Sequence, residues 1–391
     1  MNAQPTKRVA IIGGGIVGAF AAYHLTRLGC QVTVVGQMTT GNGASWRSLA
    51  WLNAAAAVTP EYHQLKMLSL NRYHQLEAIP AMSKAINFVG ALAWDGVESP
   101  AEAVQGSLES ERIVDSYHRL RALSHQVSLL SREEAGRVDP LLKTEQLPED
   151  GILFAADEGW VELASLISEL LSQVAATDGN VVIDGTAQIR TAQGRAIGVE
   201  LAEGTLIAAD AVLVAAGPET PAILAAVGVE IATSSSFGAV LITEPTPVRP
   251  RVLVRGPVGS VRADAFGSIR IHSTLIEATA HRHENGQISL DSETVQYLLS
   301  TVAGMYKGLD SLVLQRAACG TRPIPGDGMP MIGAVDDLPQ CFVAFTHSGA
   351  TLGPILGELI ASEIAFDAFT NPQLDTFRPA RLTRAGSVPT M

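Results

Sequence analysis

The chain has 391 residues and is 47% hydrophobic and 17% charged, as is typical of a globular protein too long for one ordinary domain. Its formal net charge of −12 argues against strongly anionic partners, so we expect it to bind neither nucleic acid nor an anionic membrane surface. A small substrate is not excluded, because the local field in a site need not follow the total charge.

The N-terminus predicts a β-turn-α-β unit with a glycine-rich turn. Residues 8–12 read as a buried strand and residues 31–35 as a second one, with apolar residues at helical spacing between them. The turn has the pattern G-x-G-x-x-G, which in this context presents backbone N–H groups and a helix N-terminus to a pyrophosphate. We therefore expect a dinucleotide to be bound by Gly13, Gly15, Ile16, Val17 and Gly18. The alternative is an ordinary βαβ unit with a glycine-rich turn.

The end of the second strand does not identify the dinucleotide. An acidic residue usually holds the ribose hydroxyls there, but Val35 is followed by Gly36 and Gln37. Gln37 can hydrogen-bond a ribose and is counted as a contact, yet the missing carboxylate weakens an NAD assignment. An NADP assignment would need a nearby arginine, and Arg47 stands eleven residues beyond Gly36.

The middle of the chain predicts a small β-meander and a further buried strand. Residues 194–201 and 204–210 read as the meander, and residues 211–214 as the strand. The strand ends in small residues, Ala215, Ala216 and Gly217, which let the backbone lie against a flat or phosphorylated ligand. Ala216 and Gly217 are therefore further candidate contacts.

Several motifs recur in order along nearly the whole chain. They are the glycine-rich turn, 43–48 (GASWRS), 129–134 (LLSREE), 214–217 (VAAG), 320–323 (GTRP) with 327–333 (DGMPMIG), 347–353 (HSGATLG) and 377–381 (FRPAR). Together they resemble the D-amino-acid oxidase/glycine oxidase family of FAD-dependent oxidoreductases. The resemblance implies FAD as cofactor, bound covalently or non-covalently.

The resemblance also implies an α/β fold with a second domain of the α+β class. A Rossmann-like FAD-binding domain would be assembled from the discontinuous segments 1–87, 151–235 and 319–391. A mostly antiparallel β-sheet with helices, from segments 88–150 and 236–318, would form the substrate-binding domain.

Further cofactor contacts follow from the resemblance alone. Ser45, Arg47 and Ser48 would lie along the pyrophosphate and the flavin edge, although a surface turn with a solvated arginine is the alternative. Ala187 would supply backbone contacts near the adenine. The last segment comprises Gly349, Ala350, Thr351, Leu352 and Gly353. With Pro354 near the first helical position, a helix beginning there would direct free N–H groups at the flavin pyrimidine ring. A plain strand-loop-helix is the alternative.

Arg322, in the GTRP motif, resembles the family arginine that binds the substrate carboxylate, and it is also counted among the cofactor contacts. A guanidinium suits a carboxylate because it can donate two parallel hydrogen bonds. A structural ion pair is the alternative. Arg270 lies near the place where certain oxidase relatives carry a basic residue that assists the reaction with oxygen, and His272 is a further catalytic candidate. Either side chain could instead be structural.

The predicted activity is oxidation of a C–N bond in an amino acid or related amine, by hydride transfer to flavin N5, giving an imine that water hydrolyses. One alternative is an FAD-dependent 2-hydroxy-acid dehydrogenase, which would need a histidine base such as His272 or His347. Another is a flavoprotein subunit of a larger electron-transfer complex. The electron acceptor would be oxygen or another carrier, and both a homo-oligomer and a partner subunit are compatible with the sequence.

The remaining signals concern the compartment. No run of about twenty apolar residues suggests a membrane span. The three cysteines, Cys30, Cys319 and Cys341, have no metal-type spacing, so we expect no metal and a reducing, cytoplasmic location.

Overall fold

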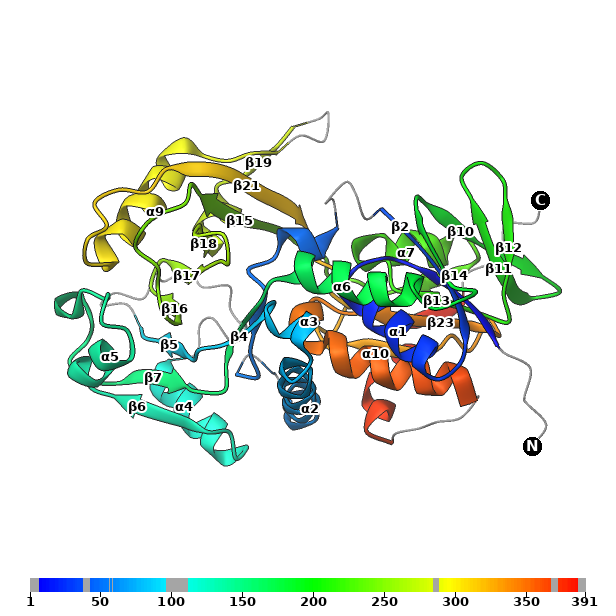
Figure 1. The fold of residues 1–391 in the computed structure, drawn as a ribbon, viewed down its shortest axis with the longest axis horizontal. Helices are drawn as coiled ribbons and strands as arrows, with labels where there is room; N and C mark the ends of the chain where they lie inside the picture. The colour runs from blue at the N-terminus through cyan, green and yellow to red at the C-terminus, as the bar shows by residue number, and fades with distance from the viewer. Residues whose placement is uncertain are drawn as a thin grey trace.

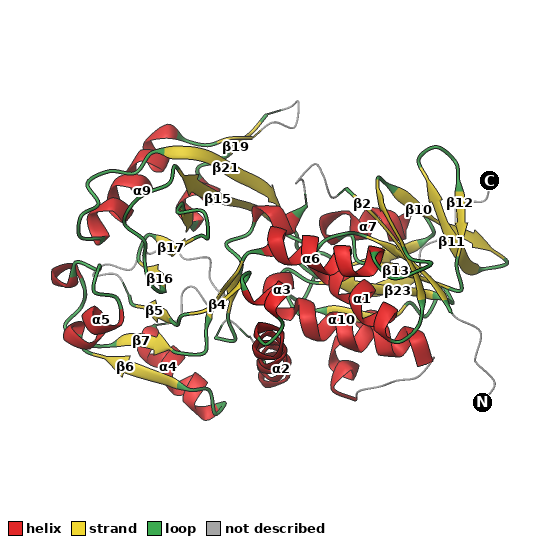
Figure 2. Ribbon diagram, in the orientation of Figure 1, coloured by secondary structure: helices red, strands yellow, loops and turns green. Residues whose placement is uncertain are grey.

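The computed structural model describes residues 7–37, 43–55, 57, 59–95, 112–283, 288–366 and 372–385. Two sheets organise these residues, a six-stranded one and an eight-stranded one, and they lie at opposite ends of the molecule in Figure 1. Figure 2 shows that helices accompany both sheets. The predicted α/β fold with a second, α+β half is confirmed.

The six-stranded sheet has the order β22-β23-β13-β1-β2-β9. Its strands are β1 (Arg8–Ile12), β2 (Gln31–Gly36), β9 (Val181–Asp184), β13 (Ala211–Val214), β22 (Met331–Ala334) and β23 (Cys341–Phe345). All neighbours are parallel except β22 and β23. Strands β13 and β23 are buried along their whole length, as expected of parallel strands covered on both faces.

Helices cover one face of this sheet and a second small sheet covers the other (Figure 1). Helix α1 (Ile16–Arg27) packs on α10 (Gly349–Phe366) and α6 (Leu163–Ala175), and α10 also packs on α2 (Pro60–Glu77). The opposite face carries the predicted β-meander, which consists of β10 (Ala187–Ala192), β11 (Arg195–Leu201) and β12 (Leu206–Ala208).

Helix α10 begins earlier than its sequence predicts. Pro354 was expected near the first helical position, but the helix starts at Gly349 and Pro354 lies inside it. A proline there cannot donate to the carbonyl of Ala350, four residues before it. The Tyr73 hydroxyl of α2 donates to that carbonyl instead, at 2.5 Å. The neighbouring helix thus supplies the bond that the proline removes, and α10 continues through it.

The same helix is the one described element that is long and apolar enough, by length and composition alone, to cross a membrane. Glu358 and Glu363 interrupt it, so its 18 residues form no continuous apolar run, but their mean hydropathy is 1.2. However, 67% of this window is buried inside the protein. The apolar composition of α10 is therefore accounted for by its contacts with α1 and α2.

The eight-stranded sheet has the order β21-β15-β18-β17-β16-β5-β7-β6 and is antiparallel except for the β16–β5 pair. The strands are β5 (Ala91–Ala93), β6 (Val127–Leu130), β7 (Ile152–Ala155), β15 (Phe237–Thr243), β16 (Leu253–Gly256), β17 (Gly259–Ala263), β18 (Ile269–His272) and β21 (Leu314–Thr321). Side chains of one face form a core with α9 (Ser292–Met305). The expected domain boundaries at 151 and 319 fall just before β7 and inside β21, so they would divide this sheet. Boundaries a few residues later, after β7 and after β21, would keep the sheet in one domain.

Shorter elements connect the two halves or lie at their edges. They are β3 (Trp51–Leu52), β4 (Ile86–Phe88) and β8 (Gly159–Val161), which form one sheet; β14 (Val229–Ile231) with β24 (Thr383–Ala385); β19 (His281–Arg282) with β20 (Ile288–Ser289); and the helices α3 (Pro80–Ser83), α4 (Ile113–Ala122), α5 (Arg132–Val138), α7 (Thr220–Ala225) and α8 (Thr274–Ala278).

Candidate active site

The glycine-rich turn after β1 is packed so closely that side chains are excluded from it. A Cβ on Gly18 would lie 1.9 Å from the carbonyl oxygen of Gly13, and a Cβ on Gly13 would lie 2.2 Å from that of Ala215. Gly13 also has φ of +123°, which L side chains rarely adopt. The turn therefore lies directly against the end of β13, where the strand order of the sheet reverses and nucleotides commonly bind.

Helix α1 begins behind this turn without a cap. Its N-cap residue, Gly15, has no side chain to serve as a cap, and its first turn contains no acidic residue. The N–H of Ile16 donates to Ser45 Oγ at 3.2 Å, which brings the 43–48 segment to the start of the helix. Unpaired N–H groups and the positive end of the helix dipole favour an anion here. The residues present thus fit a pyrophosphate.

The other predicted nucleotide contacts lie at the same edge of the sheet. Gln37 follows β2 and is exposed, while Ala187 begins β10, three residues after Asp184, which pairs with Gly36. Ala216 and Gly217 follow β13, and Gly217 has a φ of +56°. The ends of β1, β2, β9 and β13 therefore bring these residues to one edge, as the parallel strand order requires.

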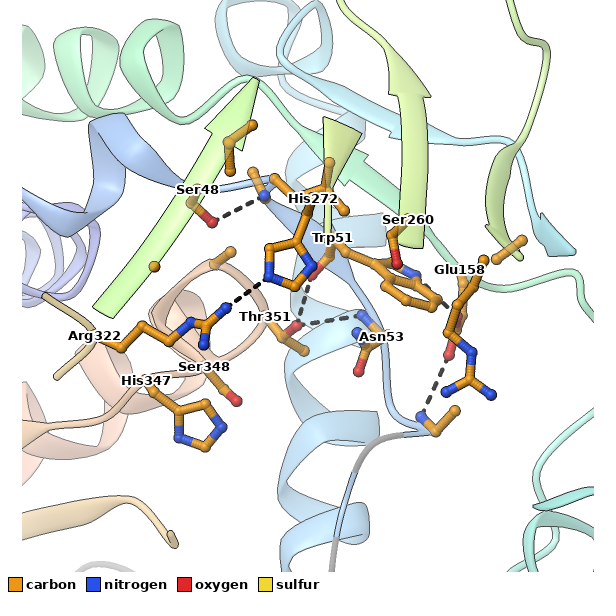
Figure 3. Close-up of a pocket in the computed structure, with 18 of the residues that line it drawn as sticks. Ser48, Trp51, Asn53, Glu158, Ser260, His272, Arg322, His347, Ser348 and Thr351 are labelled. Atoms are coloured by element: carbon orange, nitrogen blue, oxygen red, sulfur yellow. Dashed lines mark hydrogen bonds between the residues drawn. The ribbon is translucent and has the colours of Figure 1, made fainter. Parts of the chain in front are cut away.

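A cavity of about 330 Å³ lies between the two halves (Figure 3). From the nucleotide half and its connecting segments it is lined by Arg47, Ser48, Trp51, Asn53, Lys66, Glu158, His347, Ser348, Ala350 and Thr351, among others. From the eight-stranded sheet and the segment after it, the lining includes Ala91, Ala93, Leu153, Gly238, Val240, Arg255, Ser260, His272, Gly320 and Arg322.

Two glycines on neighbouring strands make room for two arginines of this cavity. Gly238 of β15 and Gly320 of β21 are register partners. A Cβ on Gly238 would lie 3.1 Å from Arg322 Nε, and one on Gly320 would lie 2.7 Å from Arg47 Cδ. The missing side chains let both arginines pass over the sheet at this point.

The guanidinium of Arg322 already has an internal carboxylate partner. Its Nη1 donates to Glu277 Oε2 at 3.0 Å and its Nη2 to Glu277 Oε1 at 2.5 Å. Nε2 of His272 lies 2.6 Å from Arg322 Nη2 and 3.2 Å from Glu277 Oε1. Burial alone would raise the pKa of Glu277, but the hydrogen bond with His272 and the charge of Arg322 outweigh it and hold that pKa below its usual value. Arg322 and His272 thus line the cavity as members of one ion-pair cluster.

Only the first residues of α10 reach the cavity. Thr351 Oγ1 donates to the Trp51 carbonyl at 3.1 Å and accepts from the Asn53 N–H at 3.2 Å, which joins the helix to the 51–53 segment (Figure 3). Ala350 also lines the cavity. Leu352 and Gly353, by contrast, are buried, and Gly353 approaches Ile16 and Phe20 of α1.

A family model described as FAD dependent oxidoreductase matches residues 8–363. The chain belongs to this FAD-dependent oxidoreductase family. It is 23% identical to a glycine oxidase of Geobacillus kaustophilus over 92% of this chain and 94% of that one. It is also 23% identical to an opine oxidase subunit of Rhizobium meliloti over 91% and 93%. Among solved structures, iminodiacetate oxidase from Chelativorans sp. BNC1 matches with a TM-score of 0.75 and 22% identity over 95% and 99%.

Family membership confirms two predictions made from the sequence. The chain is an FAD-dependent oxidoreductase, and its cofactor is FAD. The uncapped α1 and the tightly packed turn before it agree with that cofactor independently of the family, because both suit its pyrophosphate.

Arg270 lies away from the cavity of this oxidoreductase. It stands two residues before His272 on β18, on the same face but about 7 Å along the strand. Its Nε lies 3.3 Å from Asp264 Oδ2, and it lines a second cavity of about 350 Å³. Arg262, its register partner on β17, is only 1% exposed and forms a buried ion pair with Glu162 at 2.7 Å. These charged pairs therefore line the second cavity and not the one that contains Arg322.

Two buried ionisable groups line the cavity although sequence reasoning did not select them. Lys66 is 2% exposed, donates to Asn53 Oδ1 at 3.3 Å and lies over the Tyr62 ring at 4.9 Å. Burial lowers the pKa of Lys66 to about 8, against the opposing charge of Glu158. The signal was available, since Lys66 follows Tyr62 by four residues and precedes Tyr73 by seven on the apolar face of α2.

Glu158 is the second group. It accepts from Trp51 Nε1 at 2.9 Å and from the N–H groups of Ala54 and Ala55 at 3.2 and 3.3 Å. Burial raises its pKa to about 7, although these bonds and Lys66 oppose that shift. Glu158 thus fixes the 51–55 segment that forms one wall of the cavity. No sequence pattern signals this role, because its partners lie over a hundred residues away.

Proposed function

We propose that the enzyme oxidises the C–N bond of an amino acid or related amine. FAD, when bound, supplies the acceptor for a hydride from the carbon next to nitrogen, and the resulting imine is hydrolysed by water. The observation that carries the proposal is the position of Arg322, whose guanidinium enters the cavity between the two halves. The names glycine oxidase and iminodiacetate oxidase, borne by similar proteins, agree with it.

The chain offers a continuous set of groups for FAD. Gly13, Gly15 and the N-terminus of α1, with Ser45, would hold the pyrophosphate, and Gln37 and Ala187 would lie toward the adenosine. The remaining predicted contacts, Arg47, Ser48, Ala216, Gly217 and Gly349–Thr351, would lie toward the flavin. Leu352 and Gly353 would act through their packing on α1.

Arg322 would orient the substrate through its carboxylate. Glu277 occupies both Nη groups, so an incoming carboxylate either displaces Glu277 or is met by the donors that remain, which include Nε–H. Arg270 has no part in this proposal, because it lines the second cavity.

A 2-hydroxy-acid substrate is less well supported. Oxidising an alcohol requires a base for the hydroxyl proton, whereas a neutral amine reaches the flavin without one. His272 is the nearer candidate, but its Nε2 lies at hydrogen-bonding distance from Arg322 and Glu277. His347 also lines the cavity, and it has no such partner in the part of the chain that the structure describes. Replacing His347 by glutamine therefore separates the two reactions, because only alcohol oxidation should fail.

Two relatives named as opine oxidase subunits favour one further element of the proposal. A partner chain could pass electrons from FAD to the final acceptor, which would be oxygen or another carrier. We also propose a cytoplasmic location, in agreement with the three free thiols. Size-exclusion chromatography coupled to light scattering, with an activity assay of each fraction, would show whether the chain is active alone, as a homo-oligomer or only with a partner.

The decisive experiment is anaerobic bleaching of the purified holoenzyme. Its flavin absorbance should be lost on mixing with an amino acid, an N-substituted amino acid or another amine from a panel, and should persist with 2-hydroxy acids. Bleaching only by hydroxy acids would replace the proposal with the alternative. A protein that binds FAD but is bleached by no member of the panel would contradict both.

A further inference from the structure

One row of the eight-stranded sheet forms a wall of the cavity. Leu153, Ala93, Arg255, Ser260 and His272 are register partners in that order from β7 to β18, and all of them line the cavity. Neighbouring strands lie about 4.8 Å apart, so two strand spacings, about 10 Å, separate the backbones of Arg255 and His272. Arg255 stands at the middle of the row and His272 at one end, where His272 contacts the guanidinium of Arg322.

Arg255 differs from the other arginines on this side of the sheet. Arg322 pairs with Glu277, Arg262 with Glu162 and Arg270 with Asp264. Arg255 is half-buried, and its guanidinium makes no hydrogen bond or ion pair with any residue within the described ranges. A partly desolvated cation without a counter-charge is unfavourable unless a ligand supplies the counter-charge. Arg255 is thus placed to receive an anion from the cavity.

The charge of the cavity favours the same ligand. Its described lining contains five basic side chains and one carboxylate, that of Glu158. The basic residues are Arg47, Lys66, Arg119, Arg255 and Arg322. This excess of positive charge occurs in a chain whose net charge is −12. Arg119 comes from α4, which packs on β7 at the Leu153 end of the row, and its Nη2 donates to the Ala55 carbonyl at 3.1 Å.

We propose that Arg255, assisted by Arg119, forms a second anion-binding subsite, and that the preferred substrates are amines carrying two carboxylates. One carboxylate would lie at Arg322 and the other at Arg255, with the small side chain of Ser260 leaving room between Arg255 and His272. This inference rests on the proposed function for the role of Arg322, but the Arg255 subsite can be tested without turnover.

The test compares two ligands that differ by one carboxylate. Thiodiacetate and (methylthio)acetate both replace the amine nitrogen by sulfur, so neither presents a C–N bond. Dissociation constants are measured by calorimetry on the FAD-loaded enzyme for the wild type and for Arg255→Gln, Arg255→Lys and Arg251→Gln. Arg251 is the matched control, because it is exposed, lies four residues before Arg255 and does not line the cavity.

Arg255→Gln should weaken thiodiacetate binding roughly 10- to 100-fold, as expected when a charged hydrogen bond is lost, and change (methylthio)acetate binding less than about twofold. Arg255→Lys should restore part of the loss, and Arg251→Gln should have no effect. Equal weakening of both ligands, or of neither, would overturn the subsite. If the subsite holds but no amine bleaches the flavin, the proposed function fails while the anion site stands. Efficient bleaching by amino acids without a preference for dicarboxylates would support the proposed function and contradict the preference for substrates with two carboxylates.

Discussion

Glu277 holds both Nη groups of Arg322, at 3.0 and 2.5 Å, so the arginine proposed to bind substrate is partly neutralised by its own protein. Glutamine at position 277 keeps the shape and removes the charge. We expect Glu277→Gln to tighten (methylthio)acetate binding about 2- to 10-fold, because a carboxylate of the protein no longer offsets the positive charge of Arg322. Calorimetry on the FAD-loaded enzyme measures this, with the exposed Glu293→Gln on α9 as control. Weaker binding in Glu277→Gln would instead assign Glu277 to positioning Arg322.

The glycine-rich turn predicts a sharp contrast between two Gly→Ala substitutions. In Gly18→Ala the new Cβ would lie 1.9 Å from the Gly13 carbonyl oxygen, so the turn must open and FAD content should fall at least tenfold. In Gly304→Ala on α9 the Cβ meets nothing within 4 Å, so helix propensity should raise stability by about 0.5 kcal/mol. The flavin-to-protein absorbance ratio and denaturant unfolding measure the two effects. Normal FAD content in Gly18→Ala would refute the packing argument.

The buried carboxylate of Glu158 predicts a graded loss of stability. Glu158→Ala leaves the Trp51 indole N–H and two backbone N–H groups without an acceptor, and should cost about 3–5 kcal/mol. Glu158→Gln keeps one acceptor oxygen, so the loss should be roughly half as large. Urea unfolding of the apoenzyme compares the two variants. Equal losses would show that the carboxamide oxygen fails to replace the carboxylate.

The buried histidine pair on α2 and after α4 predicts acid sensitivity. His63 Nε2 lies 3.1 Å from His125 Nδ1, and burial lowers both pKa values, that of His63 to about 4. The unfolded chain therefore binds more protons than the folded chain between about pH 6.5 and 4, so stability should fall as the pH drops through this window. Each histidine contributes a slope of up to about 1.4 kcal/mol per pH unit.

The double variant His63→Gln/His125→Gln isolates this contribution. Its unfolding free energy should depend less on pH than that of the wild type between pH 6.5 and 4, and the two curves should run parallel above pH 7. His74→Gln, at an exposed position, serves as the control and should follow the wild type. Parallel curves over the whole range would show that the pair is not the acid-sensitive element.

Local patterns predicted the nucleotide half well, because its signals are short in sequence. The β1-turn-α1 unit, the small residues that end β13 and the meander of β10 to β12 each lie within a few tens of residues. Their arrangement follows from the rules of parallel sheets, so a dinucleotide site could be predicted before any coordinates, whereas family and cofactor were implied by the resemblance of the ordered motifs.

The cavity could not be derived in the same way, because its lining depends on register between distant strands. His272 and Arg270 look equivalent in sequence, yet two residues along β18 put the first in the cavity and the second beside Asp264. Likewise the bonds of Glu277 to Arg322, of Glu158 to Trp51 and of Tyr73 to Ala350 join residues 45 to 277 positions apart in sequence. A single sequence contains no pattern that reports such pairings, although the polar residue at position 66 on an apolar helix face was a usable clue.

The contact between α1 and α10 joins the glycine-rich turn to the cavity. A Cβ on Gly357 would lie 2.4 Å from Phe20 Cβ, and one on Gly353 would lie 3.0 Å from the Phe20 ring. Because α1 starts at the glycine-rich turn and α10 starts at the cavity, their mutual distance would set the span between phosphate and reacting ring if FAD binds as we propose. A methyl group added at Gly357, which does not line the cavity, should therefore alter the redox potential of the flavin and its retention together.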